Sequence, residues 1–342
     1  MYQEENYQKT NTCHLAADSF LAQLVDNAPD SSPDSYVPSV LKLKRASEWC
    51  NDARLRPDPS ALWLTLWYEG EISCLFADSN LGKSIYAVEI AHHISRNQPV
   101  VYFDFELSDK QFQLRYTDDN GYVATFNDNF LRAEIDTDAL CLKPSEFEER
   151  VMESIEATAT AAGASVLIID NLSFLCNNSD KSDMAGRFML RLIDMQRRMN
   201  LSILVLAHTP KRSLSSPITQ NDLAGSKKLF NFFDSVFAIG KSAKDESLRY
   251  IKQLKVRAGS FDYSAENVIV CEIVKDGNWL HFENKGFATE REHLKDHSDS
   301  EADKIKEKVL ELRKQGKSMA EIASLIGCSK ARVGRICKKH EN

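Results

Sequence analysis

Residues 71–90 read EISCLFADSNLGKSIYAVEI, and this stretch determines the fold that the chain is expected to adopt. The apolar run Ile72–Phe76 predicts a buried strand, and a polar turn at Ala77–Leu81 follows it. From Ile85 to Ala91 the apolar residues recur at helical spacing. A strand, a loop and a helix with Gly82-Lys83-Ser84 at the junction closely match the phosphate-binding pattern G-x-x-x-x-G-K-[ST].

This loop is suited to hold the phosphates of a nucleotide. Backbone N–H groups at a helix N-terminus point toward phosphates, and the helix dipole favours negative charge there. We expect Lys83 to reach the β- and γ-phosphates and the Ser84 hydroxyl to bind Mg²⁺. The predicted nucleotide-binding residues of the loop are Ala77, Asp78, Ser79, Asn80, Leu81, Gly82, Lys83 and Ser84.

One position departs from the pattern, because Ala77 replaces the first glycine. Alanine tolerates positive φ less well than glycine, so the start of the loop is the weakest part of the match. A chance GKS sequence in a strand-to-helix turn is the alternative explanation.

Length and composition limit the class of protein. The 342 residues suffice for one large domain and a small appendage, and 43% hydrophobic with 27% charged residues is typical of soluble globular proteins. No apolar run approaches the roughly 20 residues that cross a bilayer, and no signal peptide is visible. The eight cysteines form no C-x-x-C pair, which predicts a reduced cytoplasmic protein without zinc or a disulfide framework.

The charge is distributed unevenly along the chain. Residues 302–342 contain eleven Lys/Arg and five Asp/Glu, a charge of +6, whereas the whole chain carries −7. The remaining residues therefore carry −13. An acidic body with a basic tail indicates that the tail meets a polyanion.

The segments before the phosphate loop suggest an arm and a helix. Residues 1–36 are polar and end in a Pro/Ser/Asp cluster, so we expect a mostly disordered arm. Residues 37–55 are amphipathic and predict a helix, which either packs on its own domain or docks on a neighbouring subunit. The prolines of residues 56–59 end that helix, and residues 62–68 predict a strand that leads into the loop.

After the loop, strands alternate with helices, which predicts a mainly parallel α/β sheet flanked by helices within a domain at 37–286. Four strands are near-continuous apolar runs, as expected where both faces of a sheet are covered. Residues 108–160 read as mainly helical, with a looser part at 117–129. The predicted strands are 99–105, 165–170, 201–207 and 234–239, and then 250–256, 267–274 and 279–282 at the sheet edge, some of them antiparallel.

Ligands of parallel sheets bind at the carboxyl ends of strands, where several polar residues fall. Asp170 ends a buried strand and is expected to bind Mg²⁺ with Ser84. Glu106 is placed to orient the attacking water, or else is a helix cap or surface carboxylate. His208 is placed to contact the γ-phosphate, or else is an ordinary hydrogen-bonded histidine at a strand end.

These spacings resemble the RecA-like ATPases, and more narrowly the hexameric-helicase branch that includes the replicative helicase DnaB and the plasmid helicase RepA. The resemblance implies that Glu106 is the catalytic base, that His208 senses the γ-phosphate, and that ATP and Mg²⁺ are the cofactors. The motifs that carry it, across residues 46–282, are ADSNLGKS (77–84), FDFELS (103–108), VLIIDNL (166–172), LAHTPK (206–211), LAGSKKLFNFFDSVFAI (223–239) and LKVRAG (254–259).

The same resemblance implies an oligomer, and we expect a hexameric ring. A late K-x-R-x-G strand supplies Lys255 and Arg257 to the γ-phosphate of the neighbouring subunit, where a cation stabilises charge on the transferred phosphoryl group. A solvated strand face is the alternative for this pair.

DNA is the expected partner inside the ring. Loops 176–186 and 211–228 follow the third and fourth strands, where the family lines its channel for single-stranded DNA, although ordinary surface loops look similar. The family's primase-linked N-terminal domain is absent, so primer synthesis is not implied. The cations expected to contact phosphates there are Lys211, Arg212, Lys227 and Lys228.

The tail predicts a small all-α domain at 302–342, joined by a linker at 287–301. A helix at 302–314 precedes one opened by the capping-box spacing of Ser318 and Glu321, and a third helix spans 330–340. This resembles a resolvase-type helix–turn–helix that binds duplex DNA, with a helical protein-interaction module as the alternative. The outward basic residues nearest the DNA are Lys330, Arg332 and Arg335.

The sequence as a whole predicts a cytoplasmic RecA-fold P-loop ATPase that forms a ring and acts on DNA, with no membrane partner. A helicase for the replication of a plasmid or mobile element fits best. The first alternative is a non-unwinding DNA-bound ATPase in replication initiation, excision or transcriptional control. The second is a DNA-binding regulator that only senses nucleotide, against which the presence of Glu106 and the K-x-R pair argues.

Overall fold

The computed structural model describes residues 41–136, 144–171, 181–210, 212–223, 227–295 and 301–338. The chain forms two compact units, Met1–Asp58 and Pro59–Asn342. The predicted arm at 1–36, Lys211 and residues 176–180 of the predicted 176–186 loop lie outside the described residues. The loop prediction is wrong for residues 181–186, which form the start of helix α7 (Lys181–Met199). Within the described ranges, no helix is both long and apolar enough to span a membrane.

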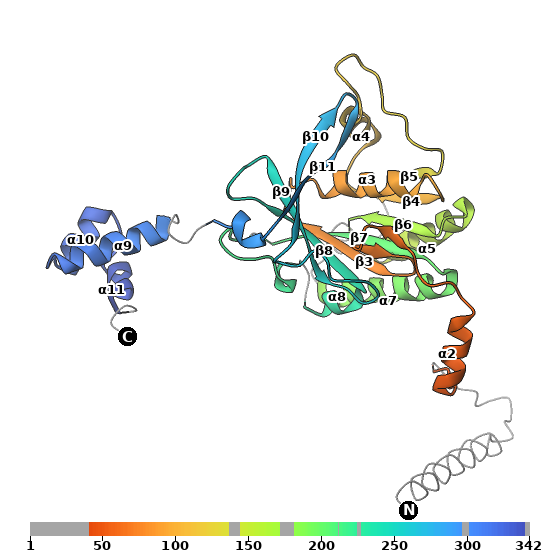
Figure 1. Cartoon of the computed structure of the whole chain (residues 1–342), viewed down its shortest axis with the longest axis horizontal. Coiled ribbons are helices and arrows are strands. Elements are labelled where there is room, and N and C mark those ends of the chain that lie inside the picture. Colours follow the sequence, from red (N-terminus) through yellow and green to blue (C-terminus); the bar gives the residue numbers. More distant parts are fainter. Residues whose placement is uncertain are drawn as a thin grey trace, which may run out of the picture. The chain divides into compact units, whose positions relative to one another are not determined.

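The first unit contains one described helix, α2 (Ala46–Arg54) (Figure 1). The helix was predicted to start at residue 37, but residues 41–45 are not helical, so that start is wrong. The helix begins after Arg45, whose backbone N–H donates to the Glu48 carboxylate at 3.3 Å. None of the helix residues is buried, and Trp49 and Leu55 are exposed.

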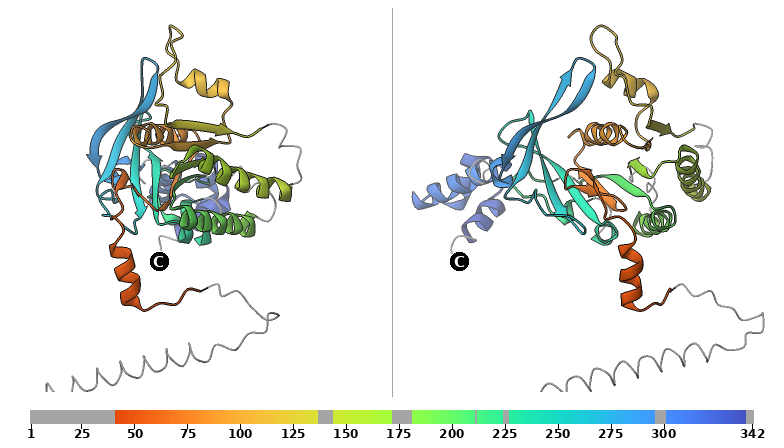
Figure 2. Two further views of the ribbon diagram at one scale, coloured as in Figure 1. Left: turned by 90° about the vertical axis from the view of Figure 1, so that its right-hand side faces the viewer. Right: turned by 45° about the vertical axis from the view of Figure 1, so that its right-hand side comes forward.

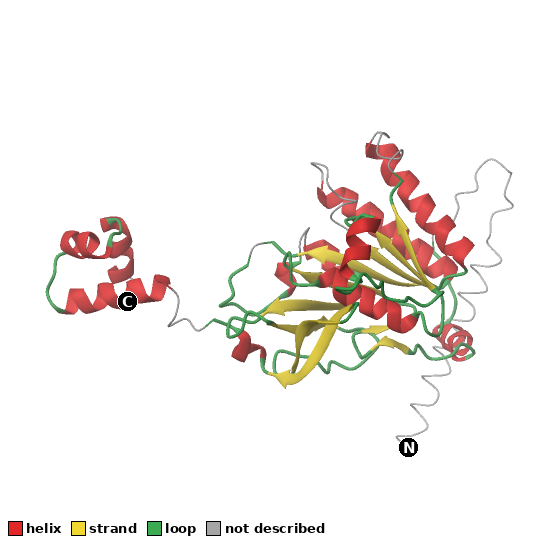
Figure 3. Ribbon diagram, turned by 90° about the horizontal axis from the view of Figure 1, so that it is seen from above, coloured by secondary structure: helices red, strands yellow, loops and turns green. Residues whose placement is uncertain are grey.

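The core of the second unit is a nine-stranded sheet in the order β11-β10-β9-β8-β3-β7-β6-β4-β5 (Figures 1 and 3). The strands from β8 to β5 run parallel, whereas β9, β10 and β11 add on antiparallel, as predicted for the sheet edge. The strands are β3 (Ile72–Ala77), β4 (Val100–Asp104), β5 (Phe130–Glu134), β6 (Val166–Asp170), β7 (Ser202–His208), β8 (Ser235–Lys241), β9 (Leu248–Lys255), β10 (Val268–Asp276) and β11 (Trp279–Ala288).

Helices cover both faces of this sheet, which explains why its central strands are apolar throughout (Figure 2). Side chains of a strand alternate between faces. Cys74 and Phe76 of β3 therefore pack with α5, α7 and α8, whereas Leu75 and Ala77 pack with α3. The helices are α3 (Lys83–Ile94), α4 (Asp109–Arg115), α5 (Pro144–Ala162), α7 (Lys181–Met199) and α8 (Lys227–Phe232).

The predicted single strand at 62–68 is wrong. The segment folds back into two short antiparallel strands, β1 (Ala61–Trp63) and β2 (Trp67–Tyr68), which form a separate sheet. Leu64 takes a positive φ of 46° in the turn between them. The reversal lets Trp67, which is fully buried, join the core beside α3.

The reading of 108–160 as mainly helical missed β5 at the edge of the sheet. This strand pairs only with β4, and its side chains are half-buried or exposed. An edge strand with mixed polar and apolar residues lacks the continuous apolar run that identified its neighbours.

Three C-terminal helices bury a small core of their own, as predicted for an all-α segment. Ser318 caps α10, since its hydroxyl accepts from the Glu321 N–H at 3.3 Å and the Glu321 carboxylate accepts from the Ser318 N–H at 2.8 Å. Gly327 ends the helix at a φ of 72°. The helices are α9 (Glu301–Lys314), α10 (Met319–Ile326) and α11 (Lys330–Lys338), and their buried residues are Val309, Ile322, Ala323, Val333 and Cys337.

Two leucines of α7 provide a matched test of this packing. Leu192 is fully buried under the sheet, whereas Leu190 is 59% exposed. We expect Leu192→Ala to lower the free energy of unfolding by about 2–5 kcal/mol, because it removes apolar contacts and leaves a cavity. Leu190→Ala carries the same change in helix propensity and is expected to cost less than about 1 kcal/mol. Urea denaturation followed by tryptophan fluorescence measures both, and equal losses would contradict the described orientation of α7.

Candidate nucleotide-binding site

The register of the strands brings the residues predicted to bind the nucleotide to the carboxyl ends of the parallel strands. Ala77 at the end of β3 lies level with His208 at the end of β7. Asp104 at the end of β4 lies level with Asp170 at the end of β6. The carboxyl ends of four strands therefore form a single rim, where parallel sheets bind their ligands.

The structure explains why alanine fits at the first position of the phosphate-loop pattern. Ala77 is the buried last residue of β3, and the positive φ angles of the loop fall on Asn80 (64°) and Gly82 (88°). A Cβ at Gly82 would lie 2.5 Å from Ile273 Cδ1 and 3.0 Å from the Phe282 ring. Glycine is thus required at the second position of the pattern and not at the first.

The positive charge of Lys83, at the start of α3, interacts with the carboxyl group of Asp170. Their exposures are 6% and 1%. Burial raises the pKa of the Asp170 carboxyl, while the charge of Lys83 and the nearby hydroxyls of Ser84 and Tyr102 oppose that rise. Tyr102 donates to Asp170 Oδ2 at 2.6 Å. Asp170 Oδ1 is buried without a hydrogen-bond partner, so it is available to a cation or its water shell.

The residues fit a magnesium ion that arrives with a nucleotide. Among the described residues, no group of three or more His, Cys, Asp or Glu side chains could hold a metal ion by itself. Mg²⁺ is commonly bound by one or two protein oxygens, with water and substrate phosphates completing its shell. Ser84 and Asp170 would hold it here, as predicted from the sequence.

Glu106, His208 and Asn171 form a compact polar group beside the phosphate loop. The Asn171 amide donates to Glu106, and His208 Nε2 lies 3.1 Å from Glu106 Oε1 and 3.0 Å from Asn171 Nδ2. The contact with His208, followed by the charge of Lys83 and the contact with Asn171, lowers the pKa of Glu106 despite partial burial. The ionised carboxylate of Glu106 can therefore orient a water, while its lowered pKa makes it a weaker proton acceptor than an ordinary glutamate.

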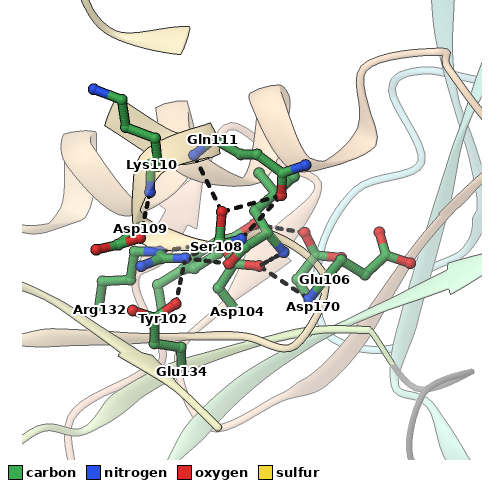
Figure 4. A network of polar contacts seen from close by, with 11 residues as sticks. Tyr102, Asp104, Glu106, Ser108, Asp109, Lys110, Gln111, Arg132, Glu134 and Asp170 are labelled. Carbon is green, nitrogen blue, oxygen red and sulfur yellow. Dashed lines mark hydrogen bonds and ion pairs between the residues drawn. The ribbon is translucent and has the colours of Figure 1, made fainter. Parts of the chain in front are cut away.

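A buried ion pair fixes the backbone that carries Glu106 (Figure 4). Asp104 Oδ1 accepts from the N–H groups of Glu106 at 3.2 Å and Leu107 at 2.9 Å. Arg132 of β5 donates from Nε to Asp104 Oδ2 at 3.1 Å and from Nη2 to the Leu107 carbonyl at 2.6 Å. Asp104 and Arg132 are thus positioning residues for the Glu106 turn.

A cavity of about 560 Å³ lies beside the phosphate loop. Lys83, Ser84, Glu106 and His208 line it, together with Arg115 from the last turn of α4. The sequence reasoning missed Arg115, Asn171 and Arg132. Only the position of Asn171, directly after the strand carboxylate, gave a signal in the sequence.

Lys255 and Arg257 are not brought to this cavity within one chain. Lys255 pairs with Val236 near the start of β8, at the opposite edge of the parallel strands. Its Nζ donates to the carbonyl of Phe233 at 2.6 Å beyond the end of α8, and burial lowers its pKa. Arg257 is 62% exposed in its side chain and pairs with Asp234 at 2.6 Å.

The predicted DNA-contacting residues occupy different settings. Lys211 lies outside the described residues, as do the side chains of Lys227 and Lys228, which open α8. Arg212 turns inward, since it donates to the Ser216 carbonyl and interacts with the Tyr250 hydroxyl. Among the side chains of α11 that the structure describes, the exposed basic ones are Lys330, Arg332 and Arg335.

A phosphate loop between β3 and α3, with carboxylates on the neighbouring strand ends, defines a RecA-like P-loop nucleotide-binding protein. Residues 38–213, just over half of the chain, match the AAA_25 model, described as an AAA domain. The chain belongs to this AAA domain family, and its core is an AAA-type ATPase domain.

Among solved structures, the KaiC-like protein PH0186 from Pyrococcus horikoshii OT3 is similar, with 12% identity and a TM-score of 0.46. The match covers 64% of this chain and 91% of that one. No curated protein matches the chain.

Lys83 provides the direct test of the site. We expect Lys83→Ala to weaken ATP binding roughly 10- to 150-fold, because a hydrogen bond to a charged group contributes about 1.5–3 kcal/mol. Lys110→Ala, at an exposed lysine of α4, is the control and should bind as the wild type does. Titration with a fluorescent ATP analogue measures both. Unchanged affinity in Lys83→Ala would place the nucleotide elsewhere.

Proposed function

We propose that this protein is an oligomeric, DNA-dependent ATPase that hydrolyses ATP between subunits and works as a DNA helicase of a plasmid or mobile element. One observation carries the proposal. An ionised Glu106 lies beside Lys83 and Asp170 at one edge of the sheet, while Lys255 and Arg257 lie at the other. One chain thus has a base and a phosphate loop. A second chain is needed to bring Lys255 and Arg257 to this site.

The residues of one chain then have distinct roles in hydrolysis. Lys83 and the N–H groups at the start of α3 hold the β- and γ-phosphates. Glu106 orients the attacking water and accepts its proton, and His208 contacts the γ-phosphate through the same polar group. Ser84 and Asp170 would hold Mg²⁺, which would supply neutralising charge for the phosphate oxygens when bound.

The neighbouring subunit completes the site. Arg257 is exposed, and its pairing with Asp234 leaves it at the surface, where it can exchange partners. The absence of buried residues in α2 fits a helix that docks on a neighbour. A hexameric ring is the arrangement we propose from these two features and the resemblance to hexameric helicases.

DNA contacts are proposed at two places. The basic residues of α11 fit a helix–turn–helix that binds duplex DNA, since Val333 and Cys337 face the core while Lys330, Arg332 and Arg335 are exposed. The loop after β7 is proposed to face single-stranded DNA in the ring channel. None of the five described cysteines forms a disulfide, which fits a reduced cytoplasmic setting.

A mixing experiment tests the shared site. We expect Glu106→Gln and Arg257→Ala each to abolish ATP turnover that single-stranded DNA stimulates, and a trans arginine can contribute about 10³–10⁵ in rate. Mixed oligomers should regain part of the turnover, because an Arg257→Ala chain keeps Glu106 and a Glu106→Gln chain keeps Arg257. Arg150→Ala, at a 72% exposed side chain of α5, is the control.

The result also decides between the candidate functions. No turnover at any protein concentration, with ATP binding retained, would refute hydrolysis and leave a nucleotide-sensing DNA-binding protein. Turnover without displacement of a strand from a forked DNA substrate would favour the non-unwinding ATPase.

The role of Glu106 also depends on the Asp104–Arg132 pair. We expect Arg132→Met to lower kcat by roughly 10²-fold while KM for ATP stays within a few-fold, because a misplaced base loses catalysis without losing phosphate contacts. Glu134→Gln removes the other carboxylate near Arg132, at 3.5 Å, without touching the Glu106 turn, and should keep full turnover. A parallel loss of kcat, nucleotide affinity and thermal midpoint in Arg132→Met would show a general structural role instead.

A further inference from the structure

A second cavity, of about 270 Å³, lies on another side of the phosphate loop. Asp78, Ser79 and Asn80 line both cavities, so this stretch of backbone is their shared wall. The second cavity is otherwise built from the loop after β7 and the ends of β8 and β9. Three of its lining residues are cations, Arg212, Lys241 and Arg249.

The register of β8 and β9 sets two of these cations against each other. Lys241 lies directly opposite Arg249 in the antiparallel pair. Like charges at directly opposed positions are unfavourable unless something neutralises them. Glu246 approaches Lys241 only at 4.0 Å and is 95% exposed in its side chain. Within the described ranges, Arg212 and Arg249 form no ion pair with a carboxylate.

Backbone carbonyls hold the two guanidinium groups in place. Arg249 Nη1 donates to the carbonyls of Glu246 and Ser247, each at 2.7 Å, and Arg212 Nη2 donates to Ser216. The Nε atoms of both arginines are buried without an acceptor. Carbonyl contacts orient these cations but do not neutralise their charge. The lining contains three cations and one carboxylate, Asp78, so its formal charge is +3 − 1 = +2 beside the phosphate loop.

The size and chemistry of the cavity select a small anion. About 270 Å³ falls below the roughly 300–1,000 Å³ of sites for larger ligands, so it suits a single group and not a whole nucleotide. Guanidinium groups match the oxygens of phosphate, and a lysine adds a point charge. We propose that Arg212, Lys241 and Arg249 form a second phosphate-binding site, separate from the phosphate loop.

Two sources could supply this phosphate group, the backbone of single-stranded DNA or a small phosphorylated solute. The site requires neither hydrolysis nor unwinding. Its DNA source rests on the proposed contact between single-stranded DNA and the loop after β7, which carries Arg212, whereas its solute source does not. Because Asp78–Asn80 line both cavities, a phosphate group bound in the second cavity would lie against the same backbone segment that holds the nucleotide.

The test uses the full chain with saturating MgADP to fill the phosphate loop. Lys241→Gln and Arg212→Gln remove one charge each, and Lys244→Gln, at an exposed lysine of the same hairpin, is the matched control. Among the described residues, Lys241 forms an ion pair only with the exposed Glu246, at 4.0 Å, so its replacement removes the charge and no strong polar contact. One arm titrates inorganic phosphate by calorimetry, and the other titrates labelled oligothymidylate by fluorescence anisotropy at several salt concentrations.

We expect Lys241→Gln to weaken binding at least about 10-fold in one arm or both, as for loss of a charge-assisted contact. Weakening of the oligothymidylate arm, with a salt slope reduced by about 1, would assign the phosphate to nucleic acid. Weakening of the inorganic phosphate arm alone would assign it to a small solute.

Binding by Lys241→Gln and Arg212→Gln equal to that by Lys244→Gln in both arms would overturn the proposal. Should the chain fail to bind ADP, the proposed function fails, and the two titrations without nucleotide still test this cavity.

Discussion

The hydrogen-bond register of the central parallel strands is the constraint on which the site depends. Ala77 is level with His208, and Asp104 is level with Asp170, so chemistry from four separated segments meets at one rim. A slip of one residue would turn every side chain of a strand to the opposite face. The strands are apolar on both faces and covered by helices on both sides, so alternation alone does not set their register. The close packing of individual side chains against these helices sets it instead.

Two carboxylates at this rim are almost fully buried, and their different partners separate a structural role from a binding role. Asp104 accepts from two backbone N–H groups and from Arg132, which satisfies both of its oxygens. Asp170 accepts from Tyr102 at Oδ2, and no donor among the described residues forms a hydrogen bond with its Oδ1. A buried carboxylate oxygen without a donor is costly, so Asp170 is the one prepared for a cation. Asp104 instead shapes the turn that carries Glu106.

Sequence reasoning predicted the parts of the molecule that local patterns determine. The phosphate loop, the four apolar strands and the capping box at Ser318 were confirmed because each depends on short-range chemistry. The edge strand β5 was missed because half-buried residues do not form an apolar run, and the turn at Leu64 was missed because apolar residues continue through it. Arg132 and Arg115 could not be assigned, since their roles arise from contacts with segments distant in sequence.

One strand of the sheet, β9, connects the rim at the carboxyl ends of the parallel strands with the other end of those strands. Lys255 is held against backbone carbonyls beyond the end of α8, where the helix dipole favours a cation, and Arg257 follows it at the surface. Strand β9 begins at the second cavity, with Arg249, and ends at Lys255. In its first half, Arg249–Ile251 are paired with both β8 and β10, whereas the half that ends at Lys255 is paired only with β8, with a register shift between Val236 and Phe237. This strand thus connects the cavity at Arg249 with the surface segment that carries Arg257.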